Sequence, residues 1–295
     1  MLLSLCLADQ PPARWEGIWQ AWSLAPEVVL PLVAALALYA GGAFTLRSGG
    51  GAPGMCMWRM ACFAAGWLVL AAALVSPLCR MAATLAWAHM LQHLMLVAVA
   101  PPLLVLGRFG AAVEALVLPR PRDHEPPDRG LRHRATFGAY HKLRSPMCAA
   151  ALYGALIWLW HVPWLYQQAL LDPLVHLSMY GSLLAAALLF WNSLIRAASL
   201  APESQIAALA ASLVTTVHTG LLGALLTFSP VLWYPLLAPR ADAWGLSPLE
   251  DQQLAGLIMW VPMGFLYAGA AAALGAAWLA AMERRNAPLM RTAGR

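Results

Sequence analysis

The feature that most constrains this chain is a series of seven long apolar blocks, at about 26–46, 58–76, 84–106, 147–162, 173–195, 205–229 and 254–282. Each block is too long for a typical strand, and most are long enough to cross a bilayer core of about 30 Å as a helix. A bilayer core has no water to satisfy backbone groups, so α-helix is the expected form. Only 11% of the residues are charged, too few to cover a water-soluble globule. The sequence therefore predicts an all-α polytopic membrane protein, a bundle of about seven transmembrane helices.

The distribution of lysine and arginine predicts the orientation of this bundle. If the N-terminus is outside, the three extracytoplasmic basic residues are Arg14, Arg80 and Arg240, and the rest of the 18 are cytoplasmic. Cytoplasmic loops of membrane proteins carry an excess of Lys and Arg, which favours N-out/C-in. The net charge of +5 then reports topology, and nucleic-acid binding is excluded as a reading.

Three parts of the chain follow from this topology. Residues 1–25 are expected to form a short extracytoplasmic tail, 26–282 the membrane domain, and 283–295 a basic cytoplasmic tail. Within the membrane domain, 108–145 reads as a basic cytoplasmic loop rich in proline and charge. The five cysteines form no CxxC and no zinc spacing, which argues against a disulfide framework and favours small apolar packing residues.

The eight histidines divide by their place in this topology. His124, His133 and His141 fall in the basic loop and read as solvated polar residues. The other five are predicted in or beside the outer half of the membrane: His89, His93, His161, His176 and His218. His89 and His93 are four residues apart on one helix face, roughly 8 and 14 Å below the outer end of that helix. Gln92 lies beside them.

Ionisable groups inside a bilayer are costly and usually face the bundle interior. Neutral imidazole is a common ligand of copper, zinc and iron, and the methionine thioether favours Cu(I). Methionines near the histidines in sequence or depth are Met90, Met95, Met179, Met259 and Met263. Two readings stay open: a metal site, or histidines that hydrogen-bond between helices beside methionines that only pack.

Five segments carry a resemblance to a known family: HMLQHLMLVAVAPPLLVLG (89–107), WHVPWLYQQALLDPLVH (160–176), LLFW (188–191), HTGLLGALLTFSPVLWYP (218–235) and WGLSPLEDQQLAGLIMWVPMG (244–264). In this order they are similar to the CtaG family of cytochrome c oxidase assembly proteins. The resemblance runs from the third apolar block to the seventh. The N-terminal third and the basic loop contribute little to it.

The resemblance implies a multi-pass protein of the bacterial inner (plasma) membrane that helps to mature a haem–copper terminal oxidase. It implies copper handling rather than enzymatic turnover, with the oxidase subunits and other copper chaperones as partners. The family's histidines correspond to His89, His93, His161, His176 and His218, and its acidic-glutamine motif to Asp251 and Gln252. Beside the five histidines, further support for a metal is expected from Met90, Gln92, Tyr180, Asp251, Gln252 and Met259. One position departs from the family pattern: Tyr180 stands where a second histidine follows four residues after His176, and a phenol is a poorer copper ligand.

Three other functions remain as alternatives. A haem-binding membrane cytochrome or redox subunit would also use histidines on different helices, although four histidines spaced across both leaflets are not seen. A copper or small-solute transporter would need ligands on both sides of the barrier, and the inner leaflet offers only the loop histidines. An interaction scaffold would use the polar groups to hold helices together and bind no metal.

Overall fold

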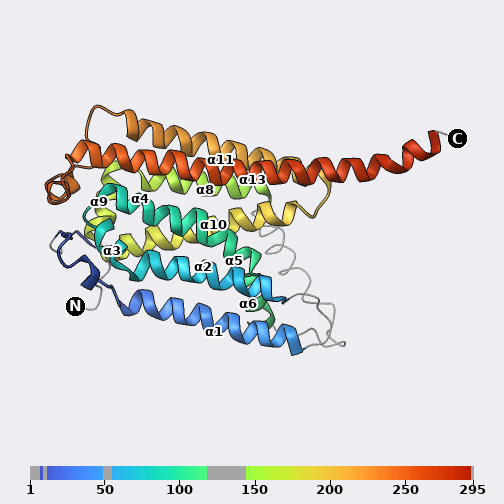
Figure 1. The fold of residues 1–295 in the computed structure, drawn as a ribbon, viewed down its shortest axis with the longest axis horizontal. Coiled ribbons are helices and arrows are strands. Elements are labelled where there is room, and N and C mark those ends of the chain that lie inside the picture. The colour runs from blue at the N-terminus through green and yellow to red at the C-terminus, as the bar shows by residue number, and fades with distance from the viewer. Residues whose placement is uncertain (1–6, 9–11, 49–54, 118–143, 294–295) are drawn as a thin grey trace, which may run out of the picture.

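The computed structural model describes residues 7–8, 12–48, 55–117 and 144–293, with the side chains of residues 48 and 286–293 also outside the description. The described chain is helical throughout, with loops between the helices and no strand. Its longest helices are α1 (Pro26–Ser48), α2 (Met57–Val75), α10 (Pro173–Ala197), α11 (Pro202–Phe228) and α13 (Pro248–Ala293). They lie roughly parallel to one axis, and α13 runs on past the others (Figure 1). The predicted all-α bundle is confirmed.

The number of spans depends on one bent pair of helices. Six helices are long and apolar enough to cross a membrane, and α8 (Pro146–Trp160) with α9 (Pro163–Leu171) makes a seventh if the pair counts as one span. The two axes meet at 76°. Pro163 opens α9 and has no amide hydrogen to continue α8, so the break falls where the sequence removes a helix bond.

The third span is built from α4 (Ala86–Leu94), a π-helical turn (Met95–Val99) and α5 (Ala100–Leu106). Pro101 and Pro102 explain this irregularity. The Val97 carbonyl would accept from residue 101 in an α-helix or residue 102 in a π-helix, and neither proline can donate. The indole of Trp191 on α10 donates to this carbonyl instead, at 3.0 Å. Trp191 of the LLFW segment therefore supplies the hydrogen bond that the two prolines cannot donate, inside the membrane where an unpaired carbonyl is costly.

Part of the segment predicted as a basic loop is helical. α6 (Phe109–Val117) follows α5 and packs against α1. Its sequence, FGAAVEALV, is mostly apolar, and the Ala112 carbonyl approaches α1 so closely that a side chain at Gly42 would overlap it. The expectation of a loop over all of 108–145 is thus wrong for 109–117. The loop histidines His124, His133 and His141 lie outside the described residues.

Helices α11 and α13 form the most extensively packed pair among the described helices, and glycines let their backbones meet. A Cβ at Gly256 would lie 2.6 Å from the carbonyl oxygen of Gly223, and a Cβ at Gly223 would lie 2.9 Å from the Gly256 carbonyl. Small residues at such crossings are typical of helix packing in membranes, where close van der Waals contact drives association. This pairing fixes α13, which carries Asp251 and Met259 toward the interior.

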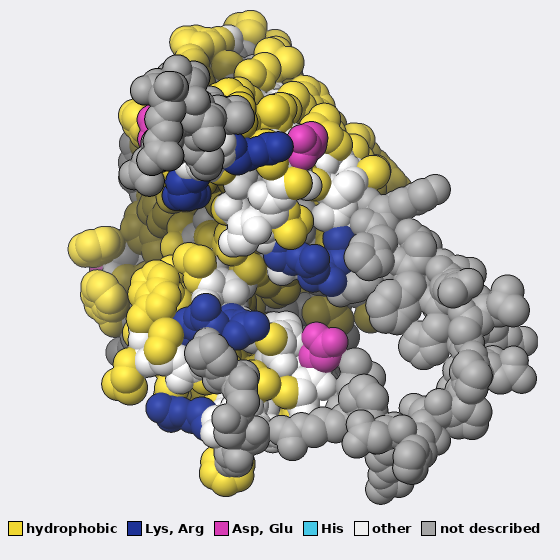
Figure 2. All heavy atoms as spheres, turned by 90° about the vertical axis from the view of Figure 1, so that its right-hand side faces the viewer, with side chains coloured by type: hydrophobic (Ala, Val, Ile, Leu, Met, Phe, Trp, Pro, Cys, Tyr) yellow, Lys and Arg dark blue, Asp and Glu magenta, His cyan; other side chains and the backbone are white. Residues whose placement is uncertain are grey.

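The two ends of the bundle differ in charge. One end, here the arginine end, carries Arg47, Arg59, Arg108, Arg144, Arg196, Arg284 and Arg285 beside its helix termini. Figure 2 looks onto this end and shows basic side chains gathered there. The other, the histidine end, holds α3 (Pro77–Ala82) and α9. The charge difference agrees with the positive-inside rule for a cytoplasmic arginine end.

The histidine end is covered by short elements, which we call the end cap: α9 together with residues 229–247. The second part contains 3-10 turns at Pro235–Leu237 and Asp242–Trp244 around α12 (Ala238–Ala241). The N-terminal segment, with a 3-10 turn at Ile18–Gln20, joins it, since the Ala8 amide donates to the Leu170 carbonyl and the Trp244 indole to that of Ala13. Cys79 on α3 is disulfide-bonded, so the reading of all cysteines as packing residues is wrong there. Disulfides persist outside the cytoplasm, in line with an extracytoplasmic histidine end.

Candidate functional site

Four histidines from three parts of the fold meet beneath the end cap. His89 and His93 lie on α4, His161 ends α8 at the bend, and His176 is in the first turn of α10. All four are buried, none more than 7% exposed. We call them the histidine cluster. The convergence predicted from their depth is thus seen for four of the five candidates.

Hydrogen bonds fix the protonation of two of these rings. His161 Nδ1 lies 2.7 Å from the Ile157 carbonyl oxygen, and His176 Nδ1 lies 2.8 Å from that of Ala169. A carbonyl oxygen only accepts, so in the neutral ring the proton is on Nδ1 and a lone pair is on Nε2. The same arrangement orients metal-binding histidines in general.

The Nε2 atoms of all four rings are buried and have no hydrogen-bond partner in the protein. His89 also lacks a well-formed bond at Nδ1, although the Ala82 carbonyl lies near its ring. Such groups are rare in folded proteins, because each costs free energy when it is removed from water unpaired. Four unpaired imidazole nitrogens in one region make this the candidate ligand site.

Tyrosine rings fill the spaces between these histidines. The rings of His89 and His93 are 4.5 Å apart, and Tyr180 lies 4.3 Å from His176 and 5.7 Å from His93, measured between centroids. The Tyr180 hydroxyl donates to Gln92 Oε1, and Gln92 Nε2 donates to the Ala73 carbonyl at 2.8 Å. Tyr180 and Gln92 thus use their polar atoms on each other and on α2, and position the rings rather than offer ligand atoms.

Methionines complete one side of the cluster. A cavity of about 10 Å³ is lined by His93 and His161 together with Met90, Met259 and Met263. A single water needs at least about 10–15 Å³, so this space suits one small ion or water and not a macrocycle. Three of the methionines singled out by the sequence as packing or ligand residues therefore border the same small space as His93 and His161.

His218 lies apart from the cluster. It sits on α11 against Gly154 of α8, so close that a Cβ at Gly154 would be 2.9 Å from His218 Nε2. Gly154 is seven residues before His161 along α8, roughly 10 Å by helix rise. His218 is only partly buried and does not line the methionine cavity.

Asp251 and Gln252 of α13 hold other elements in place. The Asp251 carboxylate accepts the amides of Ala86 at 2.8 Å and Trp87 at 3.0 Å, and so caps the N-terminus of α4. Gln252 accepts from the Trp233 amide at 2.6 Å and donates to the Val231 carbonyl at 3.0 Å. Both side chains support the site: Asp251 sets the start of the helix that carries His89 and His93, and Gln252 pins the end cap.

Two tyrosines at the site had not been singled out from the sequence. Tyr166 of α9 stacks edge-on against His89, 5.0 Å between centroids, and its buried hydroxyl has no hydrogen-bond partner in the protein. Tyr234 packs on Tyr166 at 4.2 Å and donates to the His161 carbonyl at 3.0 Å. Both lie within the segments that carry the family resemblance, but aromatic residues at a membrane interface are too common to mark a site.

The donor atoms are close to one another without forming a finished metal site. No three His, Cys, Asp or Glu side chains among the described residues stand at the spacing of a bound ion. The candidate donors are the four unpaired Nε2 atoms and the flexible thioether side chains that line the adjacent cavity.

Among known protein families, the model of the cytochrome c oxidase caa3 assembly factor (Caa3_CtaG) matches residues 37–281. This match covers most of the chain. The chain belongs to the caa3 assembly factor family. The matched region contains the whole histidine cluster, the end cap and the Asp251 cap of α4. No curated protein and no solved structure matches the chain. As a caa3 assembly factor, the protein acts in the assembly of cytochrome c oxidase, and the described helices make it a multi-pass membrane protein.

Proposed function

We propose that this caa3 assembly factor carries Cu(I) in the histidine cluster and passes it to the oxidase from the extracytoplasmic side of the bacterial inner membrane. The observation that carries the proposal is the set of four buried Nε2 atoms without a protein partner, two of them on rings, His93 and His161, that line the small cavity beside the methionines. Copper is here the cargo, and the protein is a metallochaperone rather than an enzyme. The oxidase subunits are its partners.

The donor chemistry favours Cu(I) over harder cations. No described carboxylate lines the methionine cavity, and the Asp251 oxygens accept backbone amides, so the available donors are imidazoles and thioethers. Thioether and imidazole suit Cu(I), whereas carboxylate and carbonyl oxygens suit magnesium and calcium. Cu(I) is also the form in which loss of water ligands to a buried site costs least, because it is a soft, singly charged ion.

Release requires the end cap to move. Tyr166 and Tyr234 cover the cluster, and Gln252 holds the segment that contains Tyr234 to α13. The cap is made of short helices and turns, which open more readily than packed long helices. Contact with an oxidase subunit at this end would give the copper a path that does not cross the bilayer.

Anaerobic titration of the purified protein with Cu(I), against a colorimetric Cu(I) chelator as competitor, tests the proposal. We expect one Cu(I) per chain in the wild type and loss of this binding in the double variant His89→Ala/His93→Ala. His218→Ala is the matched control, since it removes the same side chain at a membrane position outside the cluster. Unchanged stoichiometry in the double variant would refute the cluster as the site.

A spectrum of the same preparation separates the alternative functions. A Soret band that disappears in the double variant would support the haem-binding reading, although the cavity beside His93 is too small for a macrocycle in this conformation. Copper flux into liposomes would support a transporter. Absence of copper and haem from a folded, monodisperse protein would leave an assembly scaffold.

A further inference from the structure

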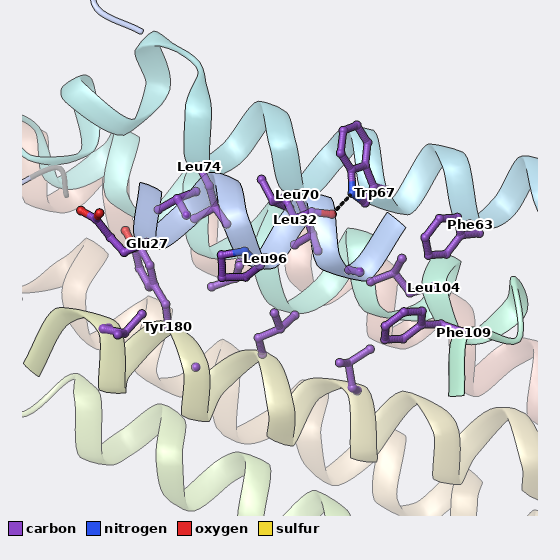
Figure 3. Close-up of a pocket in the computed structure, with 17 residues that line it drawn as sticks. Glu27, Leu32, Phe63, Trp67, Leu70, Leu74, Leu96, Leu104, Phe109 and Tyr180 are labelled. Atoms are coloured by element: carbon purple, nitrogen blue, oxygen red, sulfur yellow. Dashed lines mark hydrogen bonds between the residues drawn. The ribbon is translucent and has the colours of Figure 1, made fainter. Parts of the chain in front are cut away.

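A second and larger cavity, about 240 Å³, lies between α1 and α10 on a floor formed by α2. Tyr180, whose ring packs against His176 of the histidine cluster, also lines this cavity. None of the four histidines of the cluster lines it. α1 packs against α2 and α6, and the space between α1 and α10 is left to this groove. Figure 3 shows Glu27 and Tyr180 at one end of the groove and Phe63 and Phe109 at the other.

The groove has the length of one lipid leaflet. Along α10 it is lined from Leu177 to Leu188, and along α2 from Phe63 to Leu74. Eleven residues of helix rise about 16 Å, and half of a hydrocarbon core is about 15 Å. A transmembrane helix, about 10–12 Å across, is far too wide for a cavity of this volume. A single extended hydrocarbon chain is long enough for the groove and narrow enough for its volume.

The polar groups are confined to the end of the groove near the histidine end. Glu27 Oε1 is buried and has no protein partner, while the Trp67 indole is already bonded to the Leu32 carbonyl at 2.9 Å. The Tyr180 hydroxyl is already used as a donor to Gln92. The unpaired group at this end of the groove is therefore the Glu27 carboxylate, which is an acceptor and carries negative charge.

We propose that this groove holds one acyl chain of a phospholipid whose ammonium-bearing head group, as in phosphatidylethanolamine, pairs with Glu27. The apolar walls take the chain and the carboxylate takes the ammonium as a charge-assisted hydrogen bond. The lipid belongs to the leaflet at the histidine end, where Glu27 begins α1. It closes the bilayer side of Tyr180 and so separates the histidine cluster from bulk lipid.

Native mass spectrometry of the full chain after detergent exchange tests this site. Gly181 lines the groove, and a Cβ built there meets nothing within 4 Å, so Gly181→Leu fills the groove without a backbone clash. Gly269→Leu is the matched control, because Gly269 is an exposed glycine on α13 with the same open space. Ala35→Leu plugs the groove from α1 as a second, independent variant.

We expect one phosphatidylethanolamine retained by the wild type and by Gly269→Leu, and at least a tenfold lower occupancy in Gly181→Leu and Ala35→Leu. Glu27→Gln should keep the chain but reduce preference for phosphatidylethanolamine over phosphatidylglycerol on the order of tenfold. A wild type stripped of lipid, or plugged variants that retain it as the wild type does, would overturn the site. A retained neutral isoprenoid would overturn the head-group assignment.

Discussion

Removing the Asp251 carboxylate tests whether this side chain is a structural cap of α4 or a metal ligand. The side chain is 2% exposed and accepts two amides at the start of α4. Asp251→Ala leaves both donors unpaired, and each unpaired buried donor costs about 1–3 kcal/mol. Ala86 is buried, whereas Trp87 is partly exposed and can recruit another acceptor, so the loss is expected at about 2–4 kcal/mol. Asp251→Asn keeps one acceptor and should lose about half as much.

Thermal unfolding in detergent or nanodiscs measures this loss. For a chain of this size, a few kcal/mol corresponds to a fall in Tm on the order of 10 °C. Glu250→Gln is the control: Glu250 is the neighbouring acid, exposed, and bonded only to Ser247 at the start of its own helix. We expect no measurable change in Tm for it.

The same variants report on copper. A cap predicts that Asp251→Asn lowers Tm and retains Cu(I) stoichiometry. A ligand predicts the opposite pattern, unchanged Tm with copper lost, and that pattern would refute the assignment of Asp251 as a cap. An Asp251→Ala protein as stable as the wild type would also contradict it.

Two further predictions concern the bundle. Trp191→Phe leaves the Val97 carbonyl without its donor, and neither Pro101 nor Pro102 can replace it. The variant should be less stable by about 1–3 kcal/mol, measured as a lower Tm. A Tm equal to that of the wild type would show that the π-helical turn is stable without this hydrogen bond. The exposed free thiols Cys56 and Cys148 stand at the arginine end, so a membrane-impermeant maleimide should label them only in inverted vesicles. Labelling in intact cells, located by peptide mass spectrometry, would reverse the predicted orientation.

Depth in the membrane was predictable, and helix rotation was not. The apolar blocks and the fixed helix rise place His89, His93, His161 and His176 near one end. The same reasoning includes His218, because depth along α11 says nothing of the direction in which its side chain points. The structure turns that side chain toward Gly154 on α8, away from the other four. Only the packing of α11 on α13 and α8 sets this rotation.

Long-range polar contacts were equally hidden from sequence. In the sequence, Asp251 stands out only as part of the acidic-glutamine motif that the family resemblance implies, with no indication of its partner. It caps α4, 165 residues away in the chain. Tyr180 appeared as a weaker copper ligand in the place of a histidine, and its hydroxyl proves to be bonded to Gln92. A sequence lists donors and acceptors, but partners on other helices depend on which helices are neighbours.

These contacts also bear on the choice between a metal site and simple helix packing, which the Cu(I) titration tests. Histidines that hold helices together should spend their ring nitrogens on groups of other helices. His161 Nδ1 bonds within its own helix, His176 Nδ1 reaches only the adjacent α9, and the four Nε2 atoms bond to no protein group. Meanwhile Gln92, Tyr180, Asp251 and Gln252 around them are fully engaged. Around the cluster these four side chains are hydrogen-bonded, whereas the Tyr166 hydroxyl and the four Nε2 atoms are not, and the copper proposal rests on that contrast.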